Sequence, residues 1–141
     1  MIRPWHIYEE AEEQGIQVHF LRFEEAVAMT VPGHMAIDTE KLATTAEETT
    51  VAAHELAHSC TGSYYGADAT AEERQKQENA ADRYAIRRYL PPEQLQQAVD
   101  SGLTECWQLA DYFGFTEDFI RKAICFYRCG NLADEQFLVH D

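Results

Sequence analysis

His54-Glu55-Leu56-Ala57-His58 is the most informative stretch in this chain of 141 residues. Two histidines four positions apart lie one turn apart on the same face of an α-helix. Both imidazoles can therefore reach one zinc ion at about 2.0–2.1 Å. The glutamate beside the first histidine can accept a proton from a metal-bound water without ligating the metal. The motif predicts that His54 and His58 are zinc ligands and that Glu55 is a general base.

A catalytic zinc site needs a third protein ligand and an open fourth position. Glu78 follows His58 by twenty residues and falls on the next predicted helix, so it is the candidate third ligand. Asp82 lies one helical turn further on, where a carboxylate can accept the other ring N–H of a zinc-bound histidine and fix its tautomer. Tyr64 or Tyr65 could donate a hydrogen bond to the oxyanion of a tetrahedral intermediate.

Each of these residues also has an ordinary structural explanation. Glu78 could be a solvated acid on an acidic helix, and Asp82 could form a salt bridge with Arg83 or Lys76. The two tyrosines could pack in the core or in the loop that follows the metal helix. The sequence alone leaves these alternatives open.

The segments around the motif predict an α+β fold. Three short strands are expected at residues 16–20, 26–31 and 35–37, with a turn at Pro32-Gly33 between the last two. Consecutive short strands favour an antiparallel sheet. Helices are expected, from periodicity and from capping residues, at residues 5–14, 46–61, 71–90, 92–100, 103–113 and 116–129.

The length fits a single domain over residues 1–141. We expect a zinc-binding core over residues 1–91 and a helical C-terminal segment over residues 92–141, in which the last two helices resemble a helix-turn-helix. The N-terminus lacks the apolar run of a signal peptide, and no stretch approaches the roughly 20 apolar residues of a membrane span. We therefore expect a cytoplasmic protein without membrane contact.

The net charge is −14, from 25 acidic and 11 basic side chains. A surface this acidic repels phosphate backbones, so we expect no direct nucleic-acid binding. The last predicted helix carries Arg121, Lys122 and Arg128, but also Glu117 and Asp118, and packing or substrate contact is a better interpretation of it than DNA recognition. The charge is compatible with a basic partner, and it is equally well explained as a surface that keeps the protein in solution.

The motif followed by Glu78 and Asp82 resembles the gluzincin class of metallopeptidases, in which a glutamate of an ExxxD segment is the third ligand. The chain resembles the ImmA/IrrE family of small bacterial and phage metallopeptidases more closely, over most of its length. The segments that carry this resemblance are Gly15–Val18, Met35–Asp38, Val51–His58, Glu78–Ala85, Tyr89–Pro91 and Leu109–Thr116. Asp82 stands where many members have Asn, and either side chain can accept a hydrogen bond from an imidazole.

The resemblance implies a zincin-like fold, a Zn²⁺ cofactor and endopeptidase activity. It also implies a protein substrate, often a helix-turn-helix repressor, and an origin on a phage or mobile element. One alternative is a regulator that binds a repressor through the same fold without cleaving it, and another is a DNA-binding regulator. Retention of both histidines, the base and the third carboxylate favours the enzyme.

Overall fold

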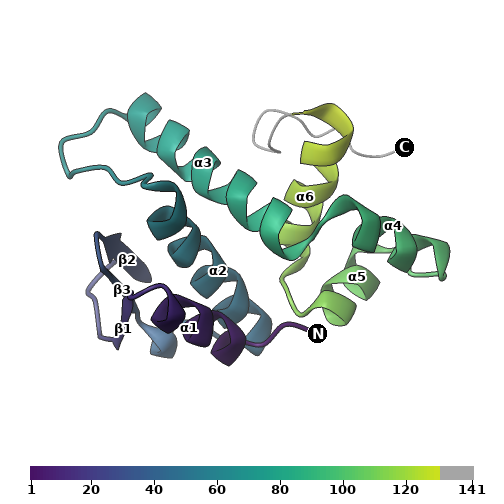
Figure 1. Cartoon of the computed structure of the whole chain (residues 1–141), viewed down its shortest axis with the longest axis horizontal. Coiled ribbons are helices and arrows are strands. Elements are labelled where there is room, and N and C mark those ends of the chain that lie inside the picture. The colour runs from purple at the N-terminus through teal and green to yellow at the C-terminus, as the bar shows by residue number, and fades with distance from the viewer. Residues whose placement is uncertain (131–141) are drawn as a thin grey trace.

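The computed structural model describes residues 1–130, so residues 131–141 of the expected C-terminal segment lie outside the described part of the chain. The fold is α+β, as predicted, with a three-stranded sheet and six α-helices in this range (Figure 1). The elements in chain order are α1 (Pro4–Glu13), β1 (Gln17–Phe20), β2 (Ala28–Val31), β3 (His34–Ile37), the 3₁₀ turn η1 (Thr39–Lys41), α2 (Thr45–Thr61), α3 (Ala71–Tyr89), α4 (Pro92–Asp100), α5 (Cys106–Phe113) and α6 (Glu117–Cys129).

The sheet is mixed, and the prediction of an antiparallel sheet is wrong for one of its two pairs. The strand order is β1-β3-β2. The tight turn at Pro32 and Gly33 makes β2 and β3 antiparallel, whereas β1 pairs with β3 in parallel. Alternation along a strand shows which side chains face the core but not which strand is its partner. The connection over residues 21–27 allows β2 to take the far edge and leaves β3 in the centre.

The helix pair α2 and α3 forms the middle of the molecule (Figure 1). The sheet and α1 lie on one side of this pair, and the C-terminal helices α4, α5 and α6 lie on the other. One buried apolar core connects both sides, and its largest members include Ile7, Met35, Leu56, Ile86, Leu109 and Ile120. The boundary placed at residue 91 stays a prediction.

The turn between α5 and α6 anchors the N-terminus of the chain. Gly114 ends α5 in the left-handed region, with φ of 91°, where glycine is favoured. The backbone N–H of Ile2 donates to the carbonyl of Phe113 over 3.0 Å. A Cβ on Gly114 would lie 2.3 Å from the backbone oxygen of Ile2. Only glycine therefore fits at this close approach.

Two further expectations can be compared with the structure. The helix expected from residue 103 begins at Cys106, because Glu105 and Gln108 form a capping box that starts the helix there. Among residues 1–130, no helix has both the length and the apolar character needed to cross a membrane.

Candidate metal centre

Helix α2 carries the two histidines of the motif on one face. Its start is fixed by Thr44, whose hydroxyl accepts the N–H of Glu47 over 3.1 Å, and it ends at Gly62 with φ of 67°. The Nε2 atoms of His54 and His58 lie 3.1 Å apart, and the two rings are almost perpendicular. One helical turn therefore brings the two imidazole nitrogens together, as the spacing predicts.

Glu78 reaches the same point from α3. This helix begins with a capping box between Thr70 and Glu73, and it packs along α2. The Oε1 atom of Glu78 lies 2.5 Å from Nε2 of His54 and 3.2 Å from Nε2 of His58. These three side chains are the group of potential metal ligands found among the described residues, with all donor atoms within 4.8 Å of one another.

The outer ring nitrogen of each histidine has an acceptor. Nδ1 of His54 lies 2.8 Å from Oδ1 of Asp82, which is the contact expected of a bracing carboxylate. Nδ1 of His58 lies 2.7 Å from the backbone oxygen of Ser63. Because a carbonyl oxygen can only accept, His58 must carry its proton on Nδ1 when it is neutral. Its Nε2 lone pair then points at the position that it shares with His54 and Glu78.

These donors fit a zinc ion. Two imidazoles and one carboxylate are a known ligand set of catalytic zinc sites. Tetrahedral coordination at about 2.0–2.1 Å separates neighbouring ligand atoms by about 3.3 Å. The distances of 3.1 Å between the two Nε2 atoms and 3.2 Å from His58 to Glu78 are close to this value. The distance of 2.5 Å from His54 to Glu78 is shorter and corresponds to a hydrogen bond.

The two carboxylates also control the protonation of the cluster. Burial opposes a charge on His54, but its hydrogen bonds to Asp82 and Glu78 outweigh that cost and raise its pKa to about 10. Burial likewise opposes the charge of Glu78, yet hydrogen bonds from the histidines and Tyr65 hold its pKa well below the usual range. Asp82 and Glu78 therefore stabilise the protonated form of His54.

Glu55 lies beside the donors without belonging to them. Its carboxylate Oε1 accepts a short hydrogen bond from the hydroxyl of Thr30, which comes from the edge strand β2. Glu55 and Glu78 both line a cleft of about 530 Å³ toward α6 and a second cleft of about 400 Å³ toward the loop after α2. Glu55 therefore borders space that a substrate can enter.

The two tyrosines that follow the metal helix differ in position. The hydroxyl of Tyr65 donates to Oε2 of Glu78, and this hydrogen bond together with burial raises the pKa of Tyr65 to about 12. Tyr64 lines the second cleft. No hydrogen bond between described residues connects the Tyr64 hydroxyl to the cluster. Of these two tyrosines, Tyr65 is therefore the one with a hydrogen bond to a candidate ligand among the described residues.

Three contacts of the site were not anticipated from the sequence. They are made by Thr30 to Glu55, by Ser63 to His58 and by Lys122 to Asp82, the last over 3.1 Å. The contact of Asp82 with a lysine agrees with the salt-bridge alternative in kind, although the partner is neither Arg83 nor Lys76. For Lys122, the sequence offered one signal: helical spacing places it on the same face as Phe119 and Phe126. This spacing does not show which other helix that face contacts.

The family model described as Peptidase_M78, IrrE N-terminal-like domain, matches residues 11–124. This range includes every candidate site residue. No curated protein and no solved structure matches the chain.

Proposed function

The chain belongs to the IrrE N-terminal-like (ImmA/IrrE) family of peptidases, and from this premise we propose that it is a zinc-dependent endopeptidase. The observation that carries the proposal is the convergence of three donor atoms from α2 and α3. The outer nitrogens of both histidines are hydrogen-bonded away from that point and the inner nitrogens are directed at it, so a bound metal would take the place of the proton between His54 and Glu78. In this proposal His54, His58 and Glu78 hold Zn²⁺.

Zinc, when bound, supplies Lewis acidity that polarises a carbonyl oxygen and makes a water acidic enough to lose its proton near neutral pH. Glu55 is positioned to accept that proton, because it lines both clefts together with the candidate ligand Glu78. Thr30 restricts the orientation of this carboxylate through its hydrogen bond. Glu55 would then deliver the proton to the leaving amine, which completes hydrolysis of the peptide bond.

Tyr65 is the better of the two tyrosines for a role at the substrate. Its hydroxyl contacts Glu78 in the cluster. The residue as a whole is 42% exposed, so the side chain has room to reorient. A phenol with a raised pKa stays protonated and remains a hydrogen-bond donor at neutral pH. We propose that Tyr65 stabilises the negative charge that develops on the substrate oxygen. Tyr64 would only line the cleft.

The substrate proposed is an extended segment of a protein. Strand β2 is an edge of the sheet, and Thr30 in its middle contacts Glu55. An extended peptide can pair with such an edge through backbone hydrogen bonds, with its side chains directed into pockets. Met29 and Val31 on this strand are 52% and 47% exposed, and both line the second cleft together with Thr30.

The partner proposed is a helix-turn-helix repressor of a phage or mobile element, in the cytoplasm. The net charge of −14 supports a basic partner, because complementary charge steers association and disfavours nucleic acid. The resemblance to the ImmA/IrrE family supports the repressor itself. The gene beside that of this protein is where such a repressor would be sought.

The test compares the wild-type protein with Glu55→Gln, which removes the base but keeps the size of the side chain. Both proteins should retain zinc, and only the wild type should cleave the repressor, as followed by mass spectrometry of the products. A Glu55→Gln variant that still inactivates the repressor in cells, without cleavage, would instead support the non-proteolytic regulator.

A further inference from the structure

Helix α6 is fixed relative to both helices that carry the candidate ligands. At its start, the backbone N–H of Thr116 donates to the hydroxyl of Thr50 on α2 over 3.1 Å. Near its end, the hydroxyl of Tyr127 donates to the carbonyl of Leu90, just after α3, over 2.8 Å. These contacts hold both ends of α6, so its side chains have defined positions toward the metal centre.

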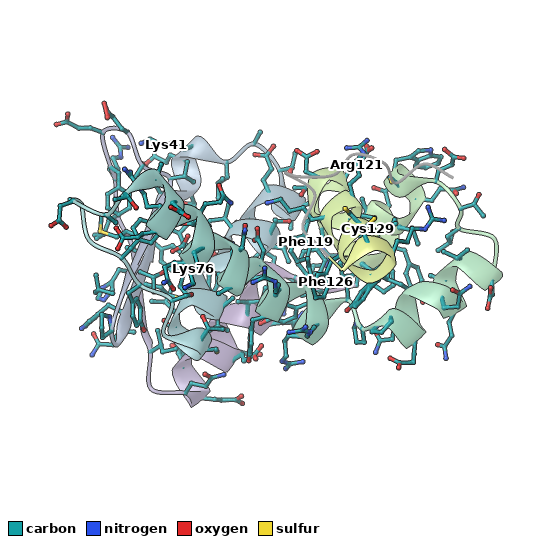
Figure 2. All side chains as sticks on the ribbon, turned by 90° about the horizontal axis from the view of Figure 1, so that it is seen from above. Lys41, Lys76, Phe119, Arg121, Phe126 and Cys129 are labelled. Atoms are coloured by element: carbon teal, nitrogen blue, oxygen red, sulfur yellow. The ribbon has the colours of Figure 1, made fainter. Side chains whose placement is uncertain are left out.

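One face of α6 is directed at α3. Phe119 and Phe126 are both buried, and Figure 2 shows them on the side of α6 that faces α3. Lys122 is three residues after the first phenylalanine and four before the second, so it shares their face. Its ammonium lies 3.1 Å from Oδ2 of Asp82. The other oxygen of Asp82 is the one in contact with His54.

The neighbouring cations have other positions. Arg121 pairs with Glu117 and Asp118 on its own helix, at 3.2 and 3.1 Å, and Figure 2 shows it away from α3. Among the lysines and arginines of residues 1–130, Lys122 is the one that forms an ion pair with Asp82. A carboxylate that is 9% exposed therefore depends on a helix other than its own for its counter-charge.

We propose that Lys122 is a positioning residue of the metal centre. A carboxylate with a donor on each oxygen cannot rotate without losing a contact, so Lys122 keeps Oδ1 of Asp82 directed at Nδ1 of His54. The ammonium also supplies a counter-charge to the carboxylate of Asp82. Helix α6 thus contributes to the geometry of the metal centre, because it carries the residue that orients Asp82. This inference rests on the proposed zinc site.

The experiment measures zinc affinity, by competition with a chelator, and the visible absorption spectrum of the cobalt-loaded protein. The proteins compared are the wild type, Lys122→Met, Lys122→Arg and, as a matched control on the same helix, Arg121→Met. Residues that contact a ligand histidine directly typically change metal affinity about 10–100-fold. Lys122 is one contact further out, so Lys122→Met should weaken zinc binding by about threefold to tenfold and shift the cobalt spectrum.

Lys122→Arg keeps the charge and should restore most of the affinity, and Arg121→Met should match the wild type. Unchanged affinity and spectrum in Lys122→Met, or equal changes in Arg121→Met, would overturn the role of Lys122. Should Lys122→Met fail to fold by circular dichroism, Lys122→Gln replaces it in the same comparison, with the same deciding outcomes. A wild type that binds neither zinc nor cobalt would overturn the proposed function itself.

Discussion

Replacement of Asp82 tests the contact that connects the two metal helices outside the candidate ligands. Its Oδ1 lies 2.8 Å from Nδ1 of His54 and its Oδ2 lies 3.1 Å from the ammonium of Lys122. Asp82→Ala removes both contacts and leaves a largely buried ring N–H without its acceptor. Zinc affinity should fall about 10–100-fold, which corresponds to about 1.4–2.7 kcal/mol.

Asp82→Asn separates the two contacts. If the amide oxygen takes the position of Oδ1, it still accepts from His54, but its NH₂ group then faces the ammonium of Lys122, donor to donor. We therefore expect a loss between those of Asp82→Ala and the wild type. Glu72→Gln, at an exposed position in the first turn of the same helix, is the control and should bind zinc normally.

The assay is competition with a chelator of known affinity at fixed pH, after circular dichroism has shown that each variant is folded. If Asp82→Ala binds zinc as tightly as the wild type, the orientation of His54 does not depend on this carboxylate. A loss of equal size in Glu72→Gln would also refute that dependence, because the effect would then arise from charge at long range.

The remaining predictions concern stability, each measured by urea unfolding. Gly114→Ala should destabilise the fold by about 2–4 kcal/mol, because it adds strain at positive φ to a clash with the backbone of Ile2. Gly15→Ala, at φ of 78° with open space around it, should lower the free energy of unfolding by only about 1 kcal/mol. If the two variants lose equal stability, the clash at Gly114 is contradicted. In chelator-treated protein, the raised pKa of His54 adds stability that is complete below its unfolded value of about 6.5 and is lost as the pH rises toward about 10. Zinc-loaded protein should lack this decline, and parallel curves for the two forms would show that His54 does not hold the extra proton.

The sequence predicted the parts of the site that local geometry determines. His54 and His58 meet because four residues make about one helical turn, and that relation holds on any α-helix. Placing Glu78 required one more assumption, that the next helix folds back along α2, and the structure places it there. The contact of Asp82 with His54 follows from the same helix pair.

Contacts between segments distant in the sequence could not be predicted in this way. Thr30 belongs to a strand whose position beside Glu55 depends on the strand order, and the sequence pattern does not determine that order. The parallel pairing of β1 with β3 was missed for the same reason. The sequence shows Lys122 only as one of three basic residues on the last helix, whereas tertiary packing directs it at Asp82.

The zinc content of the purified protein tests the central claim most directly. The wild type should hold about one zinc per chain, as expected for a single three-ligand site. Glu78→Ala, after dialysis against a weak chelator, should retain far less zinc, because the two histidines remain without their third ligand. A folded wild-type protein that purifies and reconstitutes without zinc, or a Glu78→Ala variant that holds zinc as firmly as the wild type, would contradict the account.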